Sequence, residues 1–142
     1  MLAASRVVFK RRKLWSRVSQ LLNIVLDDVA NTPQFVTNHI TKKKEIAVQD
    51  VSNTLYLIST KGKILWKKQL ADKIIGKISQ VDLYRNGRLQ LAFTTPKAFY
   101  ILDRNGKEVK PFPIKAKTEF TQAVAVFDYD KNKNYRFLAV EG

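Results

Sequence analysis

A repeat of about 45 residues is the feature that most constrains the fold of this chain. The stretch NTLYLISTKGKILWKKQL, residues 53–70, returns as AFYILDRNGKEVKPFPI, residues 98–114. The glycines of the two copies, Gly62 and Gly106, are 44 positions apart. Each copy has a tyrosine, apolar residues, a polar turn, a glycine and a lysine in the same order. The two copies therefore predict the same local structure.

A second pair of segments repeats with nearly the same period. VDLYRNGRLQLAF, residues 81–93, returns as FDYDKNKNYRFLAV, residues 127–140, and Asp82 and Asp128 are 46 positions apart. A repeat of roughly 40 to 50 residues that holds four short strands has the length of a propeller blade. One such sheet cannot cover both of its faces alone, so it must stack on a neighbour.

From residue 45 onward the sequence predicts strands in series that are joined by tight turns. Short apolar runs alternate with Gly, Asn, Asp and Lys, and no helical period is present after that point. The fold class is therefore all-β. The predicted strands are Ile46–Gln49, Thr54–Ser59, Ile64–Lys68, Ile78–Leu83, Leu89–Thr94, Phe99–Asp103, Val109–Phe112, Ala123–Phe127 and Tyr135–Val140.

Three of the turns carry residues that suit a particular backbone geometry. An Asp or Ser at the start of a turn accepts backbone N–H bonds, and a Gly three positions later adopts the left-handed conformation of a G1 bulge. An Asn-Gly pair is the strongest short hairpin signal. The turn residues predicted on this basis are Ser59 with Gly62, Asn86 with Gly87, and Asp103 with Gly106.

The repeats predict a partial β-propeller with about two complete four-stranded antiparallel blades and incomplete blades at both ends. Residues 1–30 form a basic N-terminal segment, and residues 31–142 form the blades. The blades cover about 31–70, 71–116 and 117–142, and the last is incomplete. Because both ends of the sequence fall inside a blade, we expect a longer chain or other copies to supply further blades.

The N-terminal segment leaves two structures open. No acidic residue precedes Asp27, while Arg and Lys are frequent, as in a transit peptide. Apolar residues at helical spacing favour an amphipathic helix that lies on a membrane or a partner. The tripeptide Lys13-Leu14-Trp15 resembles Ile64-Leu65-Trp66, which favours a strand at the end of a blade instead. The alternative to a propeller is an open β-meander with a helix over residues 14–26 packed across it.

The segment LYLISTKGKILW, residues 55–66, resembles the blade signature of PQQ-like, or quinoprotein-type, β-propellers. Residues 100–107 match the front half of that signature more closely, although Lys110 stands where the signature has Trp. The family includes quinone-dependent dehydrogenases and non-catalytic scaffolds such as the outer-membrane assembly lipoprotein BamB, and the chain is also similar to bacterial envelope proteins of this propeller type. The resemblance implies a location in the bacterial cell envelope, periplasmic or membrane-associated. It also implies that Trp66, and by extension Trp15, docks one blade on its neighbour, whereas the alternative is an exposed aromatic binding anchor.

The residue types that catalysis and metal binding need are scarce. The chain has no cysteine and one histidine, His39, so any triad or zinc site would have to use that residue. An Asp-x-Asp-x-Asn motif that starts at Asp128 begins like a calcium loop, but Lys133 replaces the glycine of its sharp turn. Asn132 or Asn134 is predicted to supply any positive φ in that turn. We therefore predict no catalytic residue, no cofactor and no metal ion.

The charge balance leaves two classes of binding function open. The chain has 26 Lys and Arg against 12 Asp and Glu, a net charge of +14, which attracts polyanions and anionic surfaces. Lysines in turns also keep sheet edges soluble. The first hypothesis is a non-catalytic propeller segment that acts as a protein-interaction scaffold. The alternative is a basic module that binds nucleic acid or an anionic membrane surface. A quinone- or calcium-dependent enzyme is a third and weaker hypothesis, and no small-molecule substrate is predicted.

Overall fold

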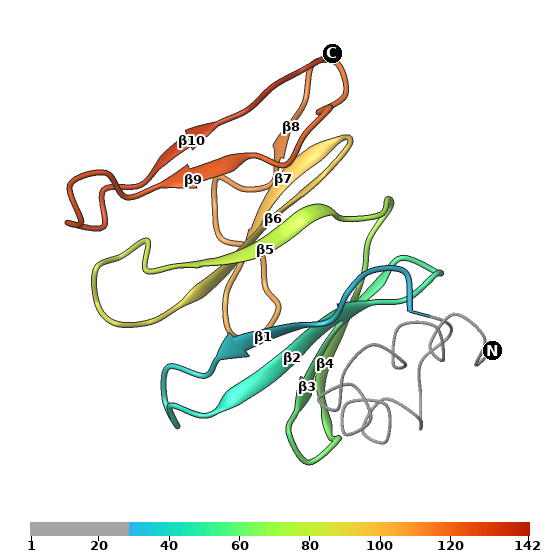
Figure 1. The fold of residues 1–142 in the computed structure, drawn as a ribbon, viewed down its shortest axis with the longest axis vertical. Helices are drawn as coiled ribbons and strands as arrows, with labels where there is room; N and C mark the ends of the chain where they lie inside the picture. The colour runs from blue at the N-terminus through green and yellow to red at the C-terminus, as the bar shows by residue number, and fades with distance from the viewer. Residues whose placement is uncertain (1–28) are drawn as a thin grey trace. The chain divides into compact units, whose positions relative to one another are not determined.

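The computed structural model describes residues 29–142, and this part of the chain contains β-strands and no helix (Figure 1). The prediction of an all-β fold with four-stranded antiparallel sheets is confirmed for these residues. The predicted N-terminal segment, with Trp15 and the alternative helix over residues 14–26, lies almost entirely outside the described residues. The strands are β1 (Gln34–Thr37), β2 (Lys44–Gln49), β3 (Thr54–Ser59), β4 (Ile64–Gln69), β5 (Ile75–Val81), β6 (Gln90–Thr95), β7 (Ala98–Leu102), β8 (Ile114–Lys115), β9 (Ala125–Phe127) and β10 (Arg136–Leu138).

The described residues divide into two compact units, and the first contains the sheet with strand order β1-β2-β3-β4. Its central strands, β2 and β3, are buried on both faces, because consecutive residues of each strand are buried. Ile46 and Val48 of β2 are buried with Tyr56 and Ile58 of β3. The first unit ends at Ala71, and residues 37–43, which connect β1 to β2, group with the second unit.

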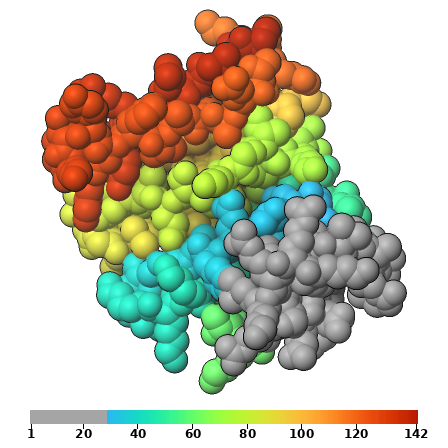
Figure 2. Space-filling model, viewed as in Figure 1, coloured from blue at the N-terminus to red at the C-terminus, as the bar shows by residue number. Residues whose placement is uncertain are grey.

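The second unit contains a sheet with strand order β5-β6-β7-β8 and a two-stranded sheet of β9 and β10. Phe99 of β7 and Phe137 of β10 are buried against each other, with ring centroids 5.1 Å apart. Phe112 contacts both rings edge-on, at 5.7 and 6.0 Å. Figure 2 shows the orange and red surface of the C-terminal residues directly against the yellow-green surface of β5. Within this unit, the β9–β10 sheet therefore covers one face of the β5–β8 sheet. Neither sheet closes on itself in the described part of the chain.

The second pair of repeated segments has the same backbone conformation at positions 46 residues apart. Arg85 and Gly87 have φ of 56° and 78°, and Lys131 and Lys133 have φ of 53° and 62°. The strands that flank the two turns also pair in the same register, Val81 with Gln90 and Phe127 with Arg136.

The prediction that Asn132 or Asn134 supplies the positive φ of the second turn is wrong. Lys131 and Lys133 have positive φ there, although a side chain makes that conformation costly. The surrounding turn imposes it, because Lys133 occupies the position that Gly87 has in the first copy.

The predicted strand Val109–Phe112 is also wrong, because the fourth strand of this sheet is β8 at Ile114–Lys115. Pro111 and Pro113 have no N–H to donate to a neighbouring strand, so the segment around them cannot continue a ladder. The segment forms a turn instead, in which the Phe112 N–H donates to the Val109 carbonyl at 2.8 Å.

Gly76 of β5 provides a test of how closely the two sheets of the second unit approach. It has a φ of 71°, and a Cβ at this position would lie 2.5 Å from the Cβ of Ala123. We expect Gly76→Ala to lower the free energy of unfolding by about 2–4 kcal/mol, because backbone strain adds to a steric clash. Urea unfolding of the full chain measures this change.

Gly87→Ala is the matched control, since Gly87 has a φ of 78° but no atom within 4 Å of the added Cβ. It should cost only the backbone strain, about 1–2 kcal/mol. Adding Ala123→Gly to Gly76→Ala should recover the difference between the two variants. If Gly76→Ala and Gly87→Ala lower the free energy of unfolding equally, and Ala123→Gly recovers none of it, the close approach of Gly76 to Ala123 would be contradicted.

Candidate functional site

The second unit contains a buried carboxylate, Asp82, which follows β5 directly. Its side chain is 2% exposed, and it accepts hydrogen bonds from the backbone N–H groups of Asn86 and Gly87 at 3.0 and 2.8 Å. The ammonium group of Lys133, from the turn between β9 and β10, donates to the same carboxylate at 2.6 Å. A buried carboxylate needs such partners, because burying an unpaired charge is very costly.

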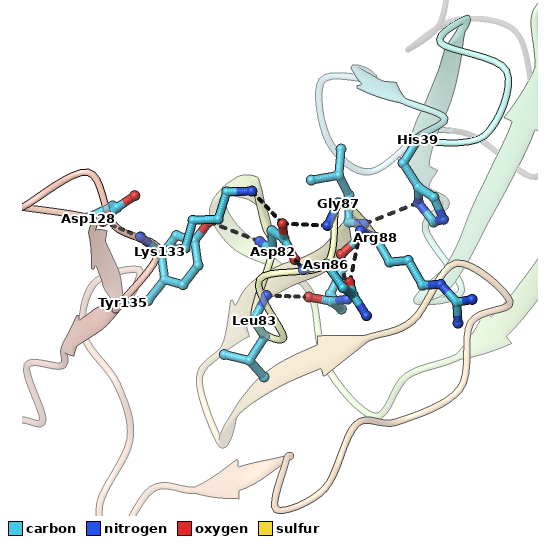
Figure 3. A network of polar contacts seen from close by, with 11 residues as sticks. His39, Asp82, Leu83, Asn86, Gly87, Arg88, Asp128, Lys133 and Tyr135 are labelled. Atoms are coloured by element: carbon cyan, nitrogen blue, oxygen red, sulfur yellow. Dashed lines mark hydrogen bonds and ion pairs between the residues drawn. The ribbon is translucent and has the colours of Figure 1, made fainter.

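Asp82 is held by contacts from both of the repeated turns (Figure 3). Its backbone N–H donates to the phenol oxygen of Tyr135 at 2.9 Å. In Figure 3, Lys133 and Tyr135 approach Asp82 from one side, and Arg88 and His39 lie beyond the loop on the other side. The carboxylate therefore connects the β5–β6 loop to the β9–β10 turn, although 51 positions separate Asp82 from Lys133.

The charges of this pair shift both pKa values away from their ordinary ranges. Burial alone would raise the pKa of Asp82, but hydrogen bonds from Lys133, Gly87 and Asn86 and the lysine charge outweigh burial and lower it. The hydrogen bond from Lys133 to Asp82, and the carboxylate charge, raise the pKa of Lys133. Both groups are therefore ionised at neutral pH.

Asp128 has the position of Asp82 in the second turn, but its carboxylate has a different role. Its Oδ1 accepts the backbone N–H of Lys133 at 3.0 Å, as Asp82 accepts that of Gly87. Asp128 thus closes its own turn, as expected of a turn-capping carboxylate. No group of three or more His, Cys, Asp or Glu side chains in residues 29–142 is arranged to hold a metal ion. The absence of catalytic, cofactor and metal residues stays a prediction.

His39 lies in the connection between β1 and β2 and is partly buried. Its Nδ1 accepts the backbone N–H of Leu89 at 3.1 Å, which fixes the neutral tautomer with the proton on Nε2. Burial lowers the pKa of His39, and the positive charges of Arg104, Lys42 and Arg88 lower it further, while Asp82 acts in the opposite direction.

The six predicted turn residues all lie in turns. The Ser59 hydroxyl and the Asp103 carboxylate accept the backbone N–H groups of Lys63 and Lys107. Gly62 and Gly106 have φ of 84° and 80°. The remaining two, Asn86 and Gly87, donate to Asp82 as described above. The structure brings Asn86, Gly87 and Asp103 together around one cavity of the second unit.

The structure leaves the predicted roles of the two tryptophans open. Trp66 is half-buried on β4 and pairs with Leu57 of β3, so its predicted blade-docking role stays a prediction. Trp15 lies outside the described residues. Sequence reasoning assigns no functional role to Asp82, Lys133 or Arg88. The 46-residue offset between the two repeated turns is the sequence signal that singles out Lys133, because it places this lysine where the first copy has Gly87.

A second candidate surface is the face of the β9–β10 sheet that points away from Phe99. We call Phe127, Arg136 and Leu138 the outer face. The register of the two strands places Val126 and Phe137 on the opposite face, in the core. The apolar members Phe127 and Leu138 are 49% and 60% exposed. Neighbouring apolar side chains with this exposure are typical of interaction surfaces.

Comparison of the chain with models of known protein families and with curated proteins finds no match. The part of the chain from residue 29 to 142 has no helix long and apolar enough to cross a bilayer.

The ion pair between Lys133 and Asp82 provides a direct test of this network. Lys133→Met keeps an unbranched side chain that lacks only the terminal ammonium position, and it leaves the Asp82 carboxylate buried without its cation. We expect the thermal unfolding midpoint to fall by at least about 5 °C at pH 7. Lys131→Met is the matched control, because Lys131 is in the same turn, also has positive φ and carries the same charge. The control should change the midpoint by less than about 2 °C.

The difference between the wild type and Lys133→Met should also depend on pH. Because the folded-state pKa of Asp82 is lowered, its contribution to stability is present above its ordinary value of 3.8 and is lost as pH falls through the folded-state pKa. Because the folded-state pKa of Lys133 is raised, its contribution is present below 10.5 and is lost at higher pH. A difference that stays constant from pH 2 to pH 7 would contradict the ion pair.

Proposed function

We propose that this chain is a segment of a β-propeller that acts as a non-catalytic protein-interaction scaffold. The exposed apolar outer face of the β9–β10 sheet carries this proposal. The same two strands bury Val126 and Phe137 against the β5–β8 sheet on their other face. A two-stranded sheet is only marginally stable by itself, so covering its second face with another sheet would be favourable.

The repeated turns support the propeller part of the proposal. Turns that start at Asp82 and Asp128 share their positive φ positions and their hydrogen bonds. Four antiparallel strands form the β5–β8 sheet, which is the number that a blade would have, and β9 and β10 would then be strands of the neighbouring blade. The resemblance to PQQ-like propellers adds support, and would place the scaffold in the bacterial cell envelope.

The charge of the chain indicates which partner would fit the outer face. Arg136 lies within this face, opposite Phe127 in the sheet, and the whole chain has a net charge of +14. Two copies of such a chain repel each other, whereas an acidic partner is attracted. We therefore propose a partner protein that presents an apolar β-sheet surface with an acidic rim.

The alternative function is binding of nucleic acid or an anionic membrane, and it is supported by the same net positive charge of the chain. On β4 the exposed residues are Leu65, Lys67 and Gln69, so a cation lies on an accessible strand face. Binding of this kind would depend steeply on salt and would not need the apolar side chains of the outer face.

Site-specific photo-crosslinking tests the scaffold proposal. A benzoylphenylalanine at Leu138 should crosslink to one acidic protein in cells that express the full chain. The same group at Ile114, which is 44% exposed on β8, is the positional control and should not capture that protein. Phe127→Ser and Leu138→Ser should each weaken binding of the purified partner by at least about 10-fold without lowering thermal stability, and Ile114→Ser should not.

The scaffold proposal fails if both positions capture the same mixture of proteins or if the serine variants bind the partner as the wild type does. DNA or vesicle binding that falls by at least about 10³-fold between 50 and 200 mM salt, together with no saturable protein partner, would favour the alternative.

A further inference from the structure

A cavity of ≈ 650 Å³ lies within the second unit, at the end of the β5–β6 loop. This volume is in the range of small-molecule sites, which is roughly 300–1,000 Å³. Three segments border it: the connection between β1 and β2, the β5–β6 loop and the turn after β7. The lining residues that bear on its chemistry are His39, Lys42, Tyr84, Arg88, Asp103 and Arg104.

The segments that border the cavity are fixed by hydrogen bonds. The Gln80 side chain of β5 accepts the backbone N–H of Thr37 at 2.8 Å and donates to the Thr37 carbonyl at 2.9 Å. Buried Asn38 accepts the N–H groups of Ile40 and Thr41 through its side chain, which fixes the turn that carries His39 and Lys42. The cavity is therefore built on loops whose backbones are already ordered.

Cations from all three segments line the cavity. Lys42, Arg88 and Arg104 each lie near enough to affect the charge state of His39. One carboxylate, Asp103, lines the cavity as well, and its Oδ1 already accepts the N–H groups of Asn105 and Lys107 within its own turn. The lining thus has an excess of positive charge.

His39 is arranged to donate a hydrogen bond rather than to add a fixed charge. Its Nδ1 is occupied by the N–H of Leu89, so Nε2–H is the ring donor that remains. Tyr84, also in the lining, is 60% exposed and offers an aromatic ring beside the cations. An array of cations, an imidazole donor and an accessible ring matches a phosphate group that is attached to a planar group.

We propose that this cavity binds a small phosphate ester, with Lys42, Arg88, Arg104 and His39 Nε2–H at the phosphate and Tyr84 beside the attached group. This site is separate from the outer face and does not depend on the scaffold proposal. The negative charge of the ligand would favour protonation of His39. The positive charges of Lys42, Arg88 and Arg104 oppose that protonation, whereas the negative charges of Asp82 and Asp103 favour it, as the ligand does. Full protonation would also remove the hydrogen bond from Leu89, so binding and protonation are coupled through this loop.

Titration of the full chain with adenosine 5′-monophosphate, followed by NMR, tests the proposal. Because the chain has one histidine, the imidazole signals report on this site alone. We expect the free protein to show the Nε2–H tautomer and a His39 pKa below the ordinary 6.5, and we expect the ligand to raise that pKa. Chemical shift changes should centre on Gly87, Arg88 and Asn105, and adenosine without phosphate should not cause them.

Charge variants separate this site from general attraction to a basic protein. Arg88→Gln with Arg104→Gln should weaken binding of the monophosphate by at least about 10-fold, the effect of losing charge-assisted contacts. The matched control is Lys110→Gln with Lys115→Gln, which removes the same charge from exposed positions of the same unit and should change affinity by less than about 2-fold. Lys42→Gln is a second site variant, in case the arginine pair alters folding.

Three results would overturn the proposal. Equal weakening by the arginine and lysine pairs would indicate general attraction of anions to the surface. An unchanged His39 pKa in the presence of saturating ligand would place the phosphate elsewhere. Binding of a single-stranded oligothymidylate with no binding of the monophosphate would assign the phosphate contacts to a nucleic acid strand. Phe127→Ser should leave monophosphate binding unchanged, so failure here is distinguishable from failure of the scaffold proposal.

Discussion

An ionised carboxylate held out of water is the constraint on which the second unit depends. Asp82 is almost fully buried, so its charge needs hydrogen-bond partners from the protein. Backbone N–H groups of its own loop fill two positions and the ammonium of Lys133 fills a third. The β5–β6 loop and the β9–β10 turn therefore have one arrangement that satisfies the charge. In that arrangement Leu89 donates to His39 on one side, and the N–H of Asp82 donates to Tyr135, which directly precedes β10, on the other.

Two surfaces with different chemistry follow from this arrangement. The outer face is apolar with a single arginine, and it suits the sheet of another protein. The cavity beside His39 is lined by cations and amides, and it suits a phosphate group. Both surfaces lie in the second unit.

The turns and most strands could be predicted from the sequence because their causes are local. Gly62 and Gly106 are required where a short turn needs positive φ, and Asp103 and Ser59 cap those turns through their own neighbours in the chain. Alternating or continuous apolar runs between such turns place the strands to within a few residues.

The rest could not be predicted because its causes are distant in the chain or depend on tertiary context. The pairing of Lys133 with Asp82 spans 51 positions, and sequence alone does not show which lysine meets which carboxylate. Strand β1 was missed because QFVT is short and half polar, so only its place in the sheet identifies it. Propensity gave Lys133 no positive φ, and the surrounding turn overrides propensity.

Hydrogen exchange at individual amides tests most directly whether the Asp82 carboxylate organises this unit. In the wild type, the N–H groups of Asn86 and Gly87 should be protected, because they donate to a buried carboxylate. In Asp82→Ala, both should exchange at least about 10-fold faster, while amides in the centre of the β6–β7 ladder keep their protection. Equal exchange of Asn86 and Gly87 in the two proteins would contradict the central role of this carboxylate.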